Sequence, residues 1–195
     1  MTTEPLQLAL VVLIAYLLGS VSSAVMVCRA LGRRDPRTAG SRNPGATNVL
    51  RVAGKDAAAM ALAGDMLKGA LAVAVARSVT PEPLAWALAG AAAFFGHLYP
   101  VFFGFRGGKG VATAIGALVT ATPWAGAGAV ATWLLVVGVF RISALGALAA
   151  FALAPVYVAL STRAPGLVVV TTVVSLMLFW RHRGNIRNLL AGTET

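Results

Sequence analysis

Charged side chains are scarce in this sequence, in which Asp, Glu, Lys and Arg make up 11% of 195 residues. A soluble domain carries roughly a quarter of its residues as these four types, so a soluble globular enzyme is excluded. Apolar residues reach 58% and the mean hydropathy is +0.82, which also excludes intrinsic disorder because such a chain has ample surface to bury. We predict an all-α integral membrane protein that forms one domain over residues 1–195.

Cysteine and histidine are nearly absent. Cys28 is the only cysteine, which excludes an intrachain disulfide and a thiolate metal site, and we interpret it as a small apolar residue at a helix end. His97 and His182 are too few for a usual zinc site. We therefore expect no metal and no cofactor.

Acidic residues number 6 against 16 Lys and Arg, which gives a formal net charge of +10. Such an excess is compatible with nucleic acid, with anionic lipid, or with the basic cytoplasmic loops of a membrane protein. The positions of the charges relative to the apolar runs distinguish these explanations.

The first apolar run, Leu6–Cys28, has 23 uncharged residues. At about 1.5 Å per residue, a helix of this length crosses a hydrocarbon core of about 30 Å. The run is longer than the apolar part of a signal peptide and lacks basic residues before it, so we interpret it as a transmembrane helix. The other segments that we expect to cross the membrane are Ala57–Ala76, Pro83–Phe105, Val111–Thr122, Trp124–Phe140, Ile142–Thr162 and Ala164–Trp180.

The segments Val111–Thr122 and Trp124–Phe140 leave two topologies open, because only Pro123 separates them. As two short helices they give seven crossings, with 13 basic residues on one side and 2 on the other; as one helix they give 10 against 5. The positive-inside rule favours a compact bundle of seven transmembrane helices, with the N-terminus outside and the C-terminus cytoplasmic. Since this topology accounts for the charge, we expect no nucleic-acid partner.

Three polar segments fall on the cytoplasmic side in this topology. Residues 40–55 contain Gly, Ser, Thr, two Asn, Arg and Lys; residues 105–113 contain Gly107-Gly108-Lys109-Gly110 before a helix; residues 181–187 follow the last helix. Free backbone N–H groups, polar donors, positive charge and a helix N-terminus suit a phosphate group. Each segment alone is also compatible with a basic loop that sets topology, but three on one face indicate a shared site for a phosphorylated ligand beside lipid.

Three ionisable residues lie inside apolar helices. Asp65 and Lys68 are three residues apart and share a helix face, where either an ion pair that supports the cytoplasmic loops or a direct substrate contact would explain them. His97 either hydrogen-bonds a neighbouring helix or holds the glycine-rich segment in place. We assign all three residues to structural support.

Taken together, these segments resemble the acyl-phosphate-dependent glycerol-3-phosphate acyltransferases, bacterial inner-membrane enzymes that make lysophosphatidic acid. The resemblance extends from about residue 7 to about residue 190. It rests on four motifs: Gly40-Ser41-x-Asn43-x-Gly45-Ala46-Thr47-Asn48-Val49-x-Arg51, Gly64-Asp65-x-x-Lys68-Gly69, Gly96-His97 with Phe105-Arg106-Gly107-Gly108-Lys109-Gly110, and His182-Arg183-x-Asn185-Ile186.

The resemblance implies transfer of a fatty acyl group from acyl phosphate to the sn-1 hydroxyl of glycerol 3-phosphate, the first acylation step of phospholipid synthesis, with release of inorganic phosphate. Acyl phosphate carries a good leaving group, so no covalent intermediate is required, in agreement with the absence of a recognisable Ser/His/Asp triad. Positioning and charge stabilisation would then supply most of the catalysis. The base is left open between His182 and a phosphate oxygen of the acceptor, and a site rich in cations favours the phosphate.

Motif positions also imply the site residues. Ser41, Arg51 and Lys109 would hold acyl phosphate with the Gly107–Gly110 amides. The residues that would hold glycerol 3-phosphate are Asn48, Lys55, Ser143, His182 and Asn185. The implied catalytic residues are Ser41, Arg51, Lys109, His182 and Asn185, and the implied substrate-binding residues are Asn43, Gly45, Thr47, Asn48, Lys55, Arg106, Gly107, Gly108, Gly110 and Ser143.

The expected partners are glycerol 3-phosphate, acyl phosphate and membrane lipid, with a functional link to the enzyme that makes acyl phosphate. The expected location is the bacterial cytoplasmic (inner) membrane, crossed several times, with the active site on the cytoplasmic face. The alternative from another class is a transporter of an anionic phosphate ester, although the polar motifs lie at one membrane face rather than at the midplane. A non-catalytic assembly factor would leave the glycine-rich segment without a purpose.

Overall fold

The computed structural model describes residues 4–194, and this part of the chain is helical without any strand, which confirms the all-α prediction. The α-helices differ widely in length, from 8 residues in α2, α3 and α10 to 25 residues in α4. They are α1 (Pro5–Gly19), α2 (Ser23–Ala30), α3 (Ala46–Ala53), α4 (Lys55–Val79), α5 (Pro83–Leu98), the 3₁₀ turn η1 (Val101–Phe103), α6 (Val111–Ala121), α7 (Pro123–Phe140), α8 (Ser143–Ser161), α9 (Pro165–Arg181) and α10 (Arg183–Leu190).

Proline marks the beginning of four of these helices, α1, α5, α7 and α9. Its ring fixes φ near the helical value, and the first turn of a helix does not need its missing N–H donor. Pro123 therefore separates α6 from α7, which confirms that residues 111–140 form two helices.

The transmembrane helix predicted over Leu6–Cys28 is divided into two helices, α1 and α2, which meet at a bend of 40° and together are long and apolar enough to form one broken crossing. The break follows Gly19 and includes two serines, Ser20 and Ser22, and Gly/Ser pairs are common sites of kinks. The predicted helix Pro83–Phe105 is also too long. It ends at Leu98 because Pro100 disfavours helical geometry at Tyr99.

Two further helices lie outside the segments that we expected to be helical. Helix α3 occupies part of the polar segment 40–55, and α10 occupies most of the basic tail 181–187. Each has eight residues, so neither contains the long apolar run on which the sequence prediction depended.

In the part of the chain that the structure describes, four helices are long and apolar enough to cross a membrane: α4, α5 with η1, α7 and α8. The bent pairs α1/α2 and α9/α10 raise the number to as many as six. Helix α6, the expected fourth crossing, has 11 residues and a length of about 16 Å, which is short of the roughly 30 Å of a hydrocarbon core. Seven crossings thus remain a prediction.

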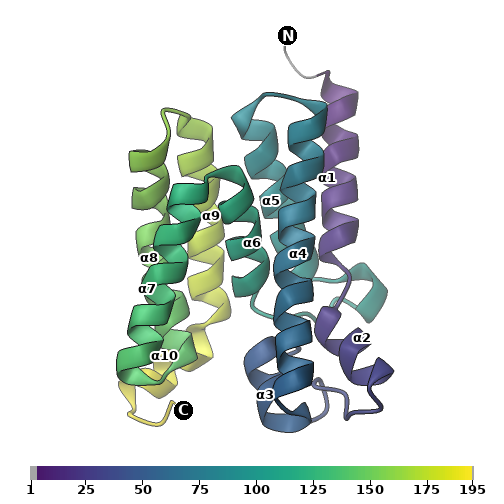
Figure 1. The fold of residues 1–195 in the computed structure, drawn as a ribbon, viewed down its shortest axis with the longest axis vertical. Helices are drawn as coiled ribbons and strands as arrows, with labels where there is room; N and C mark the ends of the chain where they lie inside the picture. The colour runs from purple at the N-terminus through teal and green to yellow at the C-terminus, as the bar shows by residue number, and fades with distance from the viewer. Residues whose placement is uncertain (1–3, 195) are drawn as a thin grey trace.

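Figure 1 shows α1, α4, α5 and α6 beside the group formed by α7, α8 and α9, with the short helices α2, α3 and α10 gathered at the end opposite the start of α1. Glycines allow the closest helix contacts. A Cβ atom at Gly19 would lie 2.1 Å from the Ala93 carbonyl oxygen between α1 and α5, and one at Gly116 would lie 2.0 Å from the Met66 oxygen between α6 and α4. This close approach is the compact small-residue packing expected in lipid.

The outward faces of the long helices carry large apolar side chains. Leu13 in α1, Leu135 in α7, Leu160 in α8 and Leu176 in α9 are each more than half exposed. A soluble protein rarely leaves extensive apolar surface open to water, so these faces are suited to lipid tails.

Candidate active site

A cavity of about 340 Å³ opens where α3, the start of α6, the start of α8 and the α9/α10 turn meet, at the end of the molecule that carries the short helices. One part of its wall is polar and the rest is apolar. The polar lining is Ser41, Asn43, Gly45, Thr47, Asn48, Arg51, Asp65, His97, Lys109, Gly110, Ser143, His182, Asn185 and Glu194, and the large apolar side chains are Leu62, Met66, Val111, Ile115, Val130, Trp133 and Leu134.

Asn48 organises the loop that carries Ser41. Its buried side chain accepts a hydrogen bond from the Ser41 N–H at 2.9 Å and donates to the carbonyl oxygens of Pro36 at 2.8 Å and Ala39 at 3.1 Å. Both amide protons are therefore used within the protein. Asn48 therefore shapes the loop around Ser41, and it also lines the cavity.

Ser143 connects this loop to a distant helix. Its hydroxyl lies 3.3 Å from the hydroxyl of Thr47, which joins the start of α3 to the first residue of α8. Ser143 thus lines the cavity beside the 41–51 segment, although its position in the sequence is almost 100 residues away.

The glycine-rich segment is held by contacts that a side chain at residue 107 or 108 would block. The Gly108 N–H donates to the His97 carbonyl oxygen at 3.1 Å, and Arg181 donates to the carbonyl oxygens of Gly107 and Gly108 at 3.3 and 2.9 Å. A Cβ at Gly107 would lie 2.0 Å from the His97 oxygen, and one at Gly108 would lie 2.2 Å from His97 Nε2. Close packing therefore fixes the backbone that precedes Lys109.

Lys68 lies at the centre of a buried polar cluster beneath this segment. Its Nζ is 2.9 Å from Asp65 Oδ1 and donates hydrogen bonds to the Val21 carbonyl oxygen at 2.7 Å and to His97 Nδ1 at 2.9 Å. Because the ammonium group is a donor, His97 Nδ1 must accept and its proton is on Nε2. The cluster links α4 to the break between α1 and α2, through Val21, and to α5, through His97. Gly107 and Gly108 pack against this same histidine.

Lys109, Asn185 and Glu194 form a chain of short hydrogen bonds across the cavity. Lys109 Nζ donates to Asn185 Oδ1 at 2.5 Å, and Asn185 Nδ2 donates to Glu194 Oε1 at 2.5 Å. Burial lowers the pKa of Lys109 and the positive charges of Arg181 and Arg51 lower it further, against the attraction of Glu194. The glutamate is thus an anion already present in a cationic site.

His182 occupies the turn between α9 and α10 and is buried. Its Nδ1 is 2.8 Å from the Leu178 carbonyl oxygen, which can only accept, so Nδ1 carries the proton and Nε2 is the free acceptor. Burial lowers the pKa of His182 to about 4, and the charges of Lys109 and Arg181 act in the same direction. The ring is therefore neutral at pH 7.

Within residues 4–194 no group of three or more His, Cys, Asp or Glu side chains is arranged to hold a metal ion. Asp65, an acidic residue of the cavity wall, is already paired with Lys68.

Comparison with known proteins identifies the family. Residues 9–192 match the family described as glycerol-3-phosphate acyltransferase. A protein of that name from Halorhodospira halophila is 51% identical over 186 residues, which cover 95% of this chain and 94% of the relative. Another from Methylococcus capsulatus is 56% identical over 180 residues, covering 92% and 91%. The chain belongs to the glycerol-3-phosphate acyltransferase family.

Solved structures of the family share the fold. The crystal structure of PlsY (YgiH), an integral membrane glycerol 3-phosphate acyltransferase, in its glycerol 3-phosphate form matches with a TM-score of 0.91 and 34% identity, over 96% of this chain and 94% of that one. The lysophosphatidic acid form of PlsY matches with a TM-score of 0.89 and 33% identity. The family resemblance and the membrane-protein prediction are confirmed.

The structure brings together most, but not all, of the residues assigned from the family motifs. Lys55, Arg106, Gly107 and Gly108 do not line the cavity: Lys55 is exposed at the start of α4, and Arg106 faces a different groove. Sequence reasoning gave no role to Arg181 or Glu194. Arg181 directly precedes His182 in a segment already singled out, which was a usable signal, whereas nothing in the tail sequence indicated that Glu194 folds back.

Proposed function

We propose that this protein transfers a fatty acyl group from acyl phosphate to the sn-1 hydroxyl of glycerol 3-phosphate, which yields lysophosphatidic acid and inorganic phosphate. One observation carries the proposal: a single cavity combines a cationic, hydroxyl- and amide-rich wall with an apolar wall. The first suits phosphate groups and the second suits an acyl chain. The names of the relatives support glycerol 3-phosphate as the acceptor.

In the proposed complex, Ser41, Arg51 and Lys109 hold the phosphate of the donor with the backbone at Gly110, where α6 begins. The helix N-terminus adds positive potential there. Ser143, His182 and Asn185 hold the acceptor. Asn43, Gly45 and Thr47 complete this wall.

Lys55 and Arg106 have no part in the proposed complex, because both lie outside the cavity lining. Asn48, Gly107 and Gly108 act by shaping the loops that present Ser41 and Lys109. The glycine-rich segment is supported by His97, which is held in turn by Lys68 and Asp65.

The apolar wall would receive the acyl chain. Met66 from α4, Ile115 from α6 and Trp133 from α7 lie on this side of the cavity. With the chain buried there, the carbonyl carbon of the acyl phosphate lies at the boundary between the apolar and the cationic walls, within reach of the acceptor hydroxyl.

The reaction needs no covalent enzyme intermediate. The sn-1 hydroxyl oxygen forms a bond to the acyl carbon, the bond from that carbon to the phosphate oxygen breaks, and inorganic phosphate departs with the bonding electron pair. Arg51 and Lys109 stabilise the negative charge that develops on the oxygens. The hydroxyl proton passes to a phosphate oxygen, since His182, with its low pKa, is a weak base.

The distribution of basic residues supports a membrane orientation. We place the end that carries α2, α3 and α10 in the cytoplasm and the start of α1 outside, with seven passes through the bacterial inner membrane, α6 being a short one packed among other helices. The basic residues of the 29–55 and 181–187 segments support this assignment through the positive-inside rule. The enzyme that makes acyl phosphate would then deliver the donor from the cytoplasmic side.

The decisive experiment measures lysophosphatidic acid formation by the purified protein from glycerol 3-phosphate, with palmitoyl phosphate and palmitoyl-CoA as separate donors. Product from palmitoyl phosphate alone supports the proposal. Activity only with palmitoyl-CoA refutes the donor assignment, and no product with either donor from folded protein refutes the function.

A site control accompanies this assay. Lys109→Ala should abolish turnover while the thermal unfolding midpoint remains near that of the wild type. Undiminished turnover in this variant would refute the assignment of the cationic wall.

A further inference from the structure

A second groove lies at the same end of the molecule, between α2 and the η1 turn, and shares no residue with the candidate active site. It is broad, with a volume of about 860 Å³. It is lined by Val25, Arg29, Arg33, Asp35, Arg37, Phe102, Phe103, Gly104 and Arg106. The proposed acyl transfer gives this groove no role.

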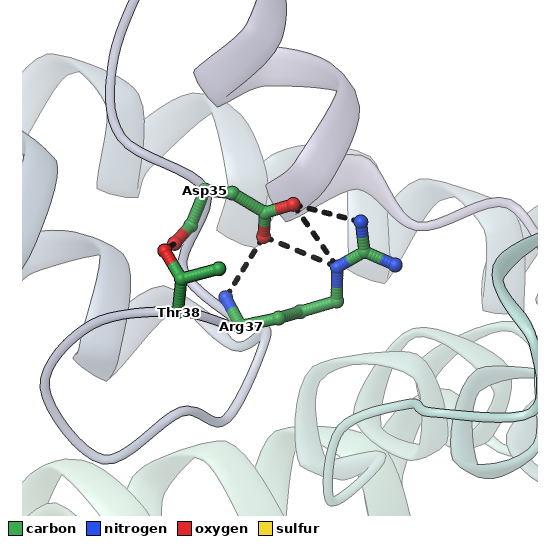
Figure 2. Close-up of polar contacts among 3 residues, drawn as sticks. All are labelled: Asp35, Arg37 and Thr38. Atoms are coloured by element: carbon green, nitrogen blue, oxygen red, sulfur yellow. Dashed lines mark hydrogen bonds and ion pairs between the residues drawn. The ribbon is translucent and has the colours of Figure 1, made fainter.

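The charge of the groove is strongly positive. Four arginines against one aspartate leave a net charge of +3. The charge of Asp35 is already balanced by Arg37, whose guanidinium group hydrogen-bonds the carboxylate (Figure 2). Arg37 Nε donates to Oδ1 at 3.1 Å, and Nη2 donates to Oδ2 at 2.7 Å. These hydrogen bonds hold the pKa of Asp35 below its usual range, so the pair stays ionised and fixed.

The other arginines remain available for an external anion. Arg29 and Arg106 are exposed, and within residues 4–194 neither guanidinium group makes a hydrogen bond or an ion pair. Arg33 lies 3.8 Å from Asp56, but both side chains are more than half exposed, so this ion pair is weak. Three guanidinium groups thus converge on one groove without a strong internal partner.

Exposed apolar side chains lie on the same two segments as these arginines. Phe102 and Phe105 are 61% and 58% exposed beside Arg106, and Met26 is 53% exposed on the helix that carries Arg29. Arginines next to exposed aromatic and aliphatic side chains are typical of the headgroup level of a bilayer, where one part of the surface contacts phosphate and the other contacts acyl chains. A site for a soluble anion would not need the apolar rim.

We propose that this groove binds the phosphate headgroup of an anionic phospholipid from the surrounding membrane. Arg29, Arg33 and Arg106 contact the phosphate, the Asp35–Arg37 pair forms a rigid wall, and Phe102 lies along the lipid glycerol and upper acyl chains. The lipid here is a bound ligand rather than a substrate.

The test is a binding titration of the purified protein in detergent, read by native mass spectrometry. Dioleoyl phosphatidylglycerol, dioleoyl phosphatidylcholine and inorganic phosphate are added separately to the wild type and to the double variant Arg29→Gln/Arg106→Gln. Each interfacial arginine contributes about fivefold to the affinity for an anionic membrane, so the double variant should bind phosphatidylglycerol roughly 30-fold more weakly. If it is obtained in low yield, the single variant Arg29→Gln should still show a loss of about fivefold.

Two controls isolate the groove. Arg141→Gln/Arg187→Gln removes the same charge from two exposed arginines outside the groove, one directly after α7 and one in α10, and should bind phosphatidylglycerol like the wild type. Lys109→Ala, which alters the candidate active site, should do so as well.

Three outcomes would overturn the proposal. These are equal binding of phosphatidylcholine, undiminished phosphatidylglycerol binding by the groove variants, and inorganic phosphate binding as tightly as phosphatidylglycerol, which would make the groove a site for a free anion. A salt-sensitive loss confined to the groove variants would support it.

Discussion

Replacing Gly107 with alanine tests whether close packing positions the cationic group that the proposed reaction needs. The new Cβ would lie 2.0 Å from the His97 oxygen and 2.6 Å from the Leu98 oxygen, both backbone atoms of α5. Ordinary contact requires about 3.4 Å, so the segment must move by about 1.4 Å. A displacement of about 1 Å in an active site can reduce the rate by about 100-fold, which is the loss of kcat/KM that we expect.

The assay is lysophosphatidic acid formation from glycerol 3-phosphate and palmitoyl phosphate, measured with the thermal unfolding midpoint of the same sample. Gly184→Ala is the matched control, because a Cβ there meets nothing within 4 Å, and it should retain wild-type turnover. If Gly107→Ala, well folded, turns over at the wild-type rate, the packing of this segment does not position Lys109 and the reasoning fails.

Three further perturbations follow from the same contacts. Lys68→Met removes the ammonium group that pairs with the buried Asp65 carboxylate and leaves His97 Nδ1, at 3.5 Å, as its remaining neighbour; the free energy of unfolding, measured by denaturation in detergent, should fall by about 3–5 kcal/mol, and a neutral result would mean that the pair contributes little. Glu194→Gln removes the anion that competes with substrate phosphate, so KM for glycerol 3-phosphate should fall by about tenfold, whereas Glu4→Gln should leave it unchanged. Since burial lowers the pKa of Lys109 from 10.5, its charge and the activity should be lost at a lower pH than for an ordinary lysine. Over the same alkaline range the free energy of unfolding should rise, because Lys109 keeps its proton in the unfolded chain after it has lost it in the folded protein. An activity profile that is flat to pH 10 would contradict the predicted loss of the Lys109 charge.

The sequence predicted the long helices well, because runs of apolar residues bounded by proline carry enough information by themselves. It did not predict the bend between α1 and α2, since that bend accompanies a contact with another helix, the packing of Gly19 against Ala93. It also missed α3 and α10, which are short and polar. Their helical form depends on packing at the end of the bundle rather than on a local apolar pattern.

The candidate site was predictable as a set of segments but not as a set of contacts. The motifs place Asn48 close to the loop that carries Ser41, and Arg106 directly before the glycine-rich segment. A motif does not give the direction in which a side chain points. Asn48 turns inward and bonds Pro36 and Ala39, and Arg106 turns into the second groove. Glu194 was beyond prediction for a related reason: its position depends on how the chain folds back after α10.

The break in the first predicted helix and the charged residue in α4 have one explanation. A bend removes regular helical bonding near Val21, and a carbonyl oxygen left unpaired at membrane depth would cost several kcal/mol. Lys68 donates to that oxygen at 2.7 Å while it also contacts Asp65 and His97. His97 in turn accepts, through its own carbonyl, the hydrogen bond that orients Gly108. Lys68 therefore stabilises the bend between α1 and α2 and, through His97, also supports the glycine-rich segment. Its loss should disturb both the bend and the glycine-rich segment.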